Sequence, residues 1–219
     1  MIQDIWPKHL DNQYKNLKPG NEDTVFYFQG SSLLARPSGH FNSQNPEENV
    51  LIYPQYDEFV QGIKSSYGDK AVDNFEFIYM LSIDEEHFFL ARKTGSLERG
   101  TFLGEMADSA VHKDMYSFVR GYEFIGVDSF RKAQPREHAY AAITAFHLYG
   151  WYRDNHFCGR CGKPLKHDDK QRMLRCYCCK NMVFPKICPA VIVAVTDKDR
   201  ILLTKYAGRT YRNYALIAG

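Results

Sequence analysis

The stretch that decides the fold runs from residue 157 to residue 185 and reads FCGRCGKPLKHDDKQRMLRCYCCKNMVFP. It contains two C-x2-C pairs separated by 14 residues, Cys158 with Cys161 and Cys176 with Cys179. Each pair suits a tight turn, or knuckle, that directs two thiolates at one ion, and two facing knuckles make a closed site of four sulfurs. A redox C-x-x-C motif is the weaker interpretation, because two pairs at this spacing are typical of zinc ribbons. The sequence therefore predicts one structural Zn2+ with no open position for catalysis.

The remaining cysteines belong to the same part of the chain, since all six lie between residues 158 and 188. Cys178 could replace a neighbour as ligand, but only Cys176 with Cys179 keeps the knuckle spacing. We expect Cys178 and Cys188 to be small buried or partly exposed thiols. Clustered cysteines indicate a metal site in a reducing compartment, whereas a disulfide scaffold would spread them along the chain.

Two further residue types in the cluster carry expectations. Gly159 and Gly162 suit knuckle turns, which need residues that tolerate unusual backbone angles. His167 is a weaker substitute ligand, and we expect it to be solvated beside Asp168 and Asp169.

Composition limits the class of protein. The chain has 219 residues, 44% of them hydrophobic, and a formal net charge of +2. A near-neutral chain is not a general binder of nucleic acid or membranes through bulk charge, although a local basic patch remains possible. The N-terminus lacks the pattern of a signal peptide, and the apolar runs FIYML and AVIVAV are too short to span a bilayer. These features predict a soluble, cytoplasmic protein.

The first half of the chain shows strand patterns. We expect a short helix near the N-terminus, a strand over residues 24–35, and a hairpin over residues 75–93 with an acidic tight turn. Residues 191–209 have the same layout, and a shift of 113 positions aligns Asp84 with Asp197. The likeness is either a coincidence between two common hairpins or a sign of two copies of one fold.

Residues 134–155 predict a buried helix that connects these two parts. Pro135 suits the first turn of a helix. Apolar side chains recur at three- and four-residue spacing, at Tyr140, Ile143, His147 and Trp151, with Ala139, Ala142 and Phe146 widening the stripe. His147 lies on this stripe as a core residue and receives no functional role.

Taken together, the segments WYRDNHFCGRCGKPL, RCYCCKNMVFPKICPAVIVAV, ILLTKY and YALIAG resemble the NADH pyrophosphatase family of Nudix hydrolases, also known as NAD-cap RNA decapping enzymes. The resemblance is specific over residues 129–219 and weaker over residues 1–128. It implies an α+β fold in four parts. These are a degenerate Nudix-like N-terminal domain (1–133), a connecting helix (134–155), a four-cysteine zinc ribbon (156–185) and the first strands of a C-terminal Nudix domain (186–219).

The resemblance also implies an activity. Members of the family hydrolyse the pyrophosphate of NADH or NAD to nicotinamide mononucleotide and AMP, or remove the NAD cap to leave 5′-monophosphate RNA, with Mg2+ or Mn2+. A homodimer is implied as well. The family's catalytic glutamates lie in the Nudix box, G-x5-E-x7-R-E-U-x-E-E-x-G-U, which is absent, because the only Arg-Glu pair, Arg136-Glu137, is followed by HAYA. Gly219 matches the first glycine of that box, so we expect a truncated sequence that is catalytically incompetent alone.

The resemblance also matches individual residues of this chain to functional positions of the family. Cys158, Cys161, Cys176 and Cys179 match the family's zinc ligands. Arg131 resembles an arginine that contacts substrate, with a plain surface charge as the alternative. Phe184 stands where relatives have a substrate-contacting tyrosine, so a hydroxyl contact would be lost. Ala218 matches the residue whose backbone carbonyl can bind the catalytic divalent metal.

A second hypothesis treats the chain as a complete, non-catalytic module that binds a protein, a nucleotide or RNA through its zinc ribbon. The apolar segments within 191–219 argue against it, because they would form an open sheet edge that aggregates unless a partner copy covers it.

Overall fold

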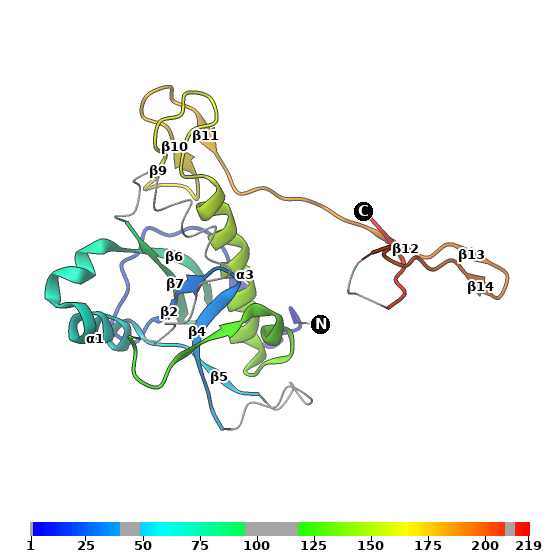
Figure 1. The fold of residues 1–219 in the computed structure, drawn as a ribbon, viewed down its shortest axis with the longest axis horizontal. Coiled ribbons are helices and arrows are strands. Elements are labelled where there is room, and N and C mark those ends of the chain that lie inside the picture. The colour runs from blue at the N-terminus through cyan, green and yellow to red at the C-terminus, as the bar shows by residue number, and fades with distance from the viewer. Residues whose placement is uncertain (1, 40–48, 95–117, 209–212) are drawn as a thin grey trace. The chain divides into compact units, whose positions relative to one another are not determined.

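The computed structural model describes residues 2–39, 49–94, 118–208 and 213–219. The chain forms two compact units, Met1–Pro185 and Lys186–Gly219, which are described separately below. The last residue of the hairpin expected over 191–209 lies outside the described residues. The architecture is mixed α+β (Figure 1).

The largest sheet of the first unit is built around a long hairpin. Its strand order is β1 (Leu10–Asp11), β6 (Phe75–Ile83), β7 (Glu86–Lys93) and β2 (Thr24–Phe26). Strands β6 and β7 are antiparallel and joined by a two-residue turn in which Asp84 has a φ of 50°. This confirms the hairpin expected over residues 75–93.

A second sheet centres on β4 (Ser32–Pro37), which pairs with β3 (Phe28–Gln29), β5 (Leu51–Ile52) and β8 (Glu123–Gly126). The single strand expected over residues 24–35 is wrong. Gly30, at a φ of 55°, turns the chain between β3 and β4, and Tyr27 separates β2 from β3.

The helix expected near the N-terminus is also absent from the described part, residues 2–20. That segment holds turns and β1. Pro7 has no backbone N–H to donate, so it interrupts a helical hydrogen-bond pattern at this point.

Helices cover both sheets (Figure 1). Within the described residues, the α-helices are α1 (Tyr56–Tyr67) and α3 (Arg136–Asp154), and the short 3-10 segments are η2 (Asp69–Asn74) and η4 (Val127–Lys132). Helix α3 confirms that a helix forms within residues 134–155, with Pro135 immediately before it as the N-cap residue.

The buried face of α3 differs from the expected stripe. Its most deeply buried positions are alanines together with two aromatic residues near its end, namely Ala139, Ala141, Ala142, Ala145, Trp151 and Tyr152. His147 is exposed, so its assignment to the core is wrong. Small alanine side chains allow the helix backbone to lie close to the core, and the larger rings then flank this contact line.

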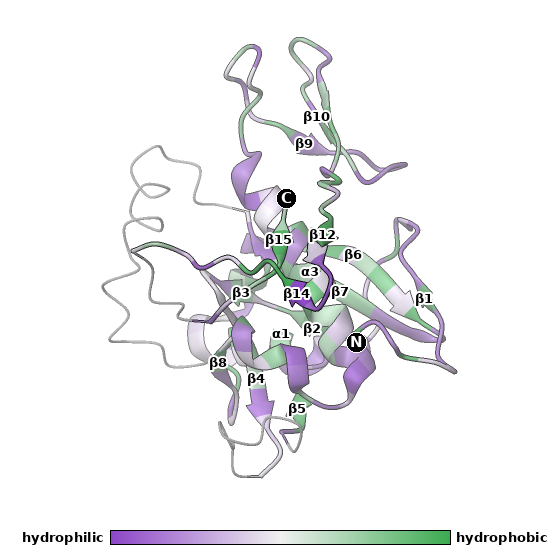
Figure 2. Ribbon diagram, turned by 90° about the vertical axis from the view of Figure 1, so that its right-hand side faces the viewer, coloured by the Kyte–Doolittle hydropathy of each residue, from purple (hydrophilic) through white to green (hydrophobic). Residues whose placement is uncertain are grey.

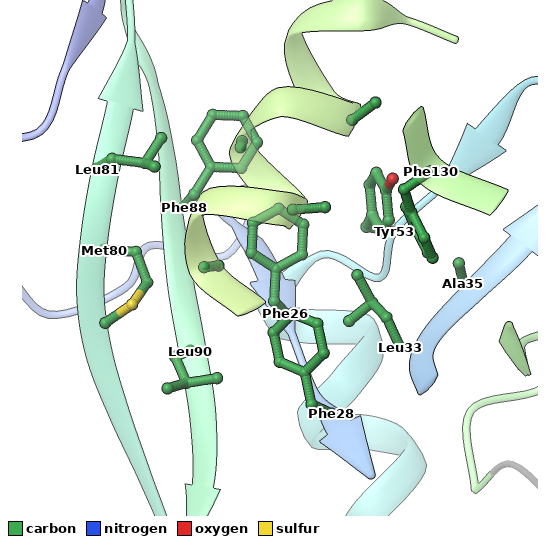
Figure 3. Close-up of a cluster of buried hydrophobic side chains, with 14 of the residues drawn as sticks. Phe26, Phe28, Leu33, Ala35, Tyr53, Met80, Leu81, Phe88, Leu90 and Phe130 are labelled. Carbon is green, nitrogen blue, oxygen red and sulfur yellow. The ribbon is translucent and has the colours of Figure 1, made fainter. Parts of the chain in front are cut away.

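Along β7 the buried side chains belong alternately to two clusters, because successive side chains point to opposite faces. On β7, Phe88 and Leu90 join one buried cluster with Ala142 of α3, while Ala91 joins a second cluster with Phe59 of α1. Figure 3 shows the first cluster, in which aromatic and aliphatic side chains from several strands converge. Both faces of this part of the sheet are therefore buried.

The first unit ends in a small three-stranded sheet. Its order is β11 (Met182–Val183), β10 (Leu174–Arg175) and β9 (Lys166–His167), all antiparallel. These strands carry the two knuckles and follow the last turn of α3 (Figure 1).

The described residues of the second unit, 186–208 and 213–219, form four two-residue strands. They are β12 (Ile192–Val193), which pairs with β15 (Ile217–Ala218), and β13 (Thr196–Asp197), which pairs with β14 (Arg200–Ile201). Its hydrophobic side chains are exposed, and Figure 2 colours β12 and β15 as hydrophobic.

The turn between β13 and β14 corrects the expected alignment of the two hairpins. Asp197 pairs with Arg200 here, as Ile83 pairs with Glu86 in the first hairpin. The turns therefore correspond at a shift of 114 residues, one more than expected.

Among the described residues, no helix is both long and apolar enough to cross a lipid bilayer.

Candidate metal centre

The two knuckles bring four sulfur atoms together. The Sγ atoms of Cys158, Cys161, Cys176 and Cys179 all lie within 4.8 Å of one another. Cys158 is 3.5 Å from Cys179, and Cys161 is 3.4 Å from Cys176, sulfur to sulfur. Four sulfurs at about 2.3 Å from one zinc ion are about 3.8 Å apart, so this arrangement fits a tetrahedral site. In the part of the chain that the structure describes, no other set of three or more such ligands converges.

The two knuckles share one backbone pattern. The N–H of Cys158 donates to the carbonyl of Lys163, and the N–H of Gly162 donates back to the carbonyl of Cys158, both at 2.8 Å. The second knuckle repeats these bonds between Cys176 and Asn181 and between Lys180 and Cys176, both at 2.9 Å. These hydrogen bonds close a short backbone loop around each pair of cysteines.

The fourth residue after the first cysteine of each knuckle takes a left-handed conformation. Gly162 has a φ of 68°, and Lys180 has a φ of 61° at the equivalent position. Gly159 does not share this conformation, so only one of the two glycines is needed for the reason expected. The left-handed conformation of Lys180 was not expected from the sequence. Its position in the segment C-x2-C-K-N nevertheless corresponds to that of Gly162 in C-x2-C-G-K.

Backbone amides prepare two of the thiols for metal binding. Desolvation raises the pKa of the Cys158 thiol, but hydrogen bonds from the backbone of Arg160 and Cys161 outweigh it and lower that pKa to about 6. A backbone hydrogen bond from Cys179 is the main cause that lowers the pKa of the Cys176 thiol. The side-chain amide of Asn181 also lies 3.6 Å from the Cys158 sulfur. A thiolate is the form that binds a metal, so these bonds favour the ligating state of Cys158 and Cys176, whereas hydrogen bonds to neighbouring cysteine sulfurs and burial raise the pKa values of Cys161 and Cys179.

Side chains of the ribbon attach it to the rest of the first unit. Leu174 is 1% exposed and belongs to the main core. The guanidinium of Arg172 donates to the backbone carbonyls of Asn12, at 3.3 Å, and of Met80. The ribbon is therefore anchored on the N-terminal sheet through both apolar packing and hydrogen bonds to backbone carbonyls.

His167 takes part in this attachment. Its ring centroid lies 5.1 Å from that of Tyr14 and 5.6 Å from that of Tyr152. Burial lowers the pKa of His167, so the neutral imidazole is favoured. The expectation that His167 is solvated is wrong, and it lies outside the converging set of sulfurs. Cys178 and Cys188 are both exposed.

The expected substrate contacts are not brought together. Arg131 is exposed in η4, just before α3 begins, whereas Phe184 follows β11 in the ribbon after α3 has ended. The helix between them has 19 residues and is about 28 Å long. A substrate contact at either residue stays a prediction.

A cavity of about 440 Å3 lies beside the ribbon. Its walls include Glu76, Arg92, Lys166 and Asp169, which are two basic and two acidic residues. Arg92 is already paired with Glu76 at 2.7 Å. The cavity offers no excess of positive charge for two phosphates, and we do not assign a dinucleotide to it.

Comparison with known proteins gives partial matches. No protein-family model matches the chain. The NAD-capped RNA hydrolases NudC of Pseudomonas aeruginosa (strain LESB58) and Pseudomonas putida (strain W619) are 35% and 36% identical to it over 69 residues, which is 32% of this chain and 25% of each relative. The NAD-capped RNA hydrolase NudC of Salmonella typhi is 32% identical over 72 residues, or 33% of this chain and 28% of the relative.

These matches confirm the resemblance expected from the sequence for about a third of the chain. The matched part spans only about a quarter of the relatives' own length.

Proposed function

We propose that the chain is part of a Nudix hydrolase that cleaves the pyrophosphate of NADH or NAD, or the NAD cap of RNA. The products are nicotinamide mononucleotide and AMP, or 5′-monophosphate RNA. The observation that carries the proposal is the identity of 32–36% to proteins named NAD-capped RNA hydrolase. The four-cysteine site supports it, because the resemblance implies a zinc ribbon at these residues.

In this proposal, the first 133 residues are the degenerate Nudix-like domain and residues 186–219 begin the catalytic one. The ribbon holds a structural Zn2+ through Cys158, Cys161, Cys176 and Cys179. The whole protein works as a cytoplasmic homodimer. Arg131 and Phe184 contact substrate when the full active site is assembled.

Ala218 has a backbone orientation that supports its proposed role as a metal ligand. Val191 and Gly219 exchange both of their backbone hydrogen bonds, at 2.7 and 3.1 Å. In an antiparallel pair the next residue directs its own N–H and carbonyl away from the partner strand. Ala218 pairs with Ile192 in this way. Its backbone carbonyl therefore accepts no hydrogen bond from β12.

The 219 residues supply too few ligands for the catalytic metal. Bound Mg2+ or Mn2+ would neutralise the pyrophosphate and activate the attacking water. Hard cations prefer several oxygen ligands, and within the described residues no set of three carboxylates converges. We derive no catalytic step from these residues, and we propose that hydrolysis requires the Nudix box in addition.

The test is an assay of NADH hydrolysis with Mg2+ or Mn2+, using two proteins. We expect no turnover by the 219-residue chain, and turnover to AMP and nicotinamide mononucleotide by the product of the whole coding sequence, read past the codon for Gly219. The coding sequence should continue into the Nudix box. A stop codon without a box would favour the non-catalytic module, and robust turnover by the 219 residues would contradict the incompetence of this part.

A further inference from the structure

The ribbon sheet has one face that packs inward. Leu174 of β10 pairs with His167 of β9 and with Val183 of β11. Residues that lie opposite each other in antiparallel strands share a face. Leu174 belongs to the main core and Val183 packs against that core, so this row of side chains faces the N-terminal sheet.

The neighbouring row therefore faces outward, because successive side chains alternate. It consists of Lys166, Arg175 and Met182, which are paired across the three strands. The ammonium of Lys166 lies 5.8 Å from the ring centroid of Tyr177. Phe184 follows two residues after Met182 and is also exposed. We call these five residues the ribbon face.

The ribbon face exposes large apolar side chains. Tyr177 is 57% exposed, Met182 is 51% exposed and Phe184 is 48% exposed. Three such residues on one small sheet differ from singly scattered surface residues, which need no explanation. A ligand that stacks on rings would use this surface.

The ribbon also carries an excess of cations. Residues 156–185 contain two acidic side chains, Asp168 and Asp169, and seven basic ones, Arg160, Lys163, Lys166, Lys170, Arg172, Arg175 and Lys180. Arg172 is turned inward, and Arg175 is paired with Asp168 at 3.2 Å. Four thiolates around Zn2+ carry two negative charges, and the ribbon remains net positive with the ion bound.

We propose that the ribbon face binds single-stranded RNA, with bases stacked on Tyr177 and Phe184 and phosphates beside Lys166. Aromatic rings combined with cations are the recurring chemistry of single-strand binding, and stacking requires no particular base. A protein partner is disfavoured, because lysine is depleted at protein interfaces. The choice of RNA rests on the proposed function, and it makes the substrate contact proposed for Phe184 a contact with the transcript beyond the cap.

The test measures fluorescence anisotropy of a labelled, uncapped and unstructured RNA of about 12 nucleotides, a length within the range of known single-strand sites. The zinc-loaded 219-residue chain is titrated against it at several salt concentrations. Phe184→Ala lies outside both knuckles, and we expect it to weaken binding by roughly 5- to 100-fold. Lys166→Gln should reduce the slope of log affinity against log salt by about 0.7, as expected for one lost phosphate contact.

The matched controls are Tyr67→Ala and Lys70→Ala. They remove an exposed ring at the end of α1 and an exposed cation just after that helix. They should leave RNA affinity unchanged. Absence of binding by the unsubstituted chain, or equal losses in the control and ribbon variants, would overturn the proposal. NADH hydrolysis by the product of the whole coding sequence is scored separately. RNA binding without hydrolysis would refute the proposed function alone, and hydrolysis without RNA binding would refute the ribbon face alone.

Discussion

At the scale of single residues, the two knuckles adopt the same backbone conformation with different residue types. Both need a left-handed residue four positions after the first cysteine, and the chain places Gly162 at one and Lys180 at the other. A residue with a Cβ atom is strained by about 1–2 kcal/mol in this conformation. The backbone of Lys180 in the second knuckle is therefore strained, whereas that of Gly162 in the first knuckle is not.

We predict opposite effects from exchanging these residue types. Gly162→Ala should lower the stability of the zinc-bound ribbon by about 1 kcal/mol, and Lys180→Gly should raise it by a similar amount. Thermal unfolding of the zinc-loaded chain, with competition by a chelator, measures both effects.

Gly159→Ala is the matched control. A Cβ atom meets nothing within 4 Å at either Gly159 or Gly162, and only Gly162 has a positive φ. Equal effects of the two alanine substitutions would show that backbone conformation is not the cause.

The sequence predicted the ligands of the candidate site but not its surroundings. The C-x2-C spacing is local, so the convergence of Cys158 and Cys161 follows from the chain itself. The burial of His167 depends on Tyr14, which is 153 residues away and has no signature in a local pattern. Contacts of this kind require the tertiary fold.

At the scale of elements, α3 is held by the small side chains on its buried face. Ala142 is 1% exposed and Ala145 is fully buried. The periodic pattern found the helix and included Ala142, but it also placed His147 in the core. Hydrophobic spacing gives the period of a helix more reliably than its contact face, because alanine contributes little to the pattern.

We predict that Ala145→Leu destabilises the first unit by about 1–3 kcal/mol, because a larger side chain cannot be accommodated without displacing the helix. The matched control is His147→Leu, two residues further along the same helix and exposed, which should change stability by no more than about 0.5 kcal/mol. Urea unfolding followed by circular dichroism compares the two. If His147→Leu lowered the free energy of unfolding more than Ala145→Leu, His147 would be a core residue, as expected from the sequence.

Helix α1, in contrast, was not among the elements expected from the sequence. Its buried side chains, Phe59, Val60 and Ile63, stand at the three- and four-residue spacing of an amphipathic helix. Gly62 also lies within it and lowers helix propensity. The pattern was present, but it is short and is flanked by strand-like segments.

At the scale of the molecule, the ribbon connects the fold to the proposed function. Its inward face is anchored through Leu174 and Arg172, and its outward face carries the proposed RNA contacts. The matches to NAD-capped RNA hydrolases rest on about a third of the chain. The central claim about the ribbon is that its four converging cysteines bind one zinc ion.

The most direct test of this central claim is the zinc content of the purified chain, measured by elemental analysis together with the number of thiols that react with a cysteine reagent. We predict about one zinc per chain, and two reactive thiols, Cys178 and Cys188, because both are exposed and neither is a ligand. Cys176→Ser should lose the ion, whereas Cys178→Ser should retain it. A chain without zinc and with six reactive thiols, or loss of the ion from Cys178→Ser, would contradict the account.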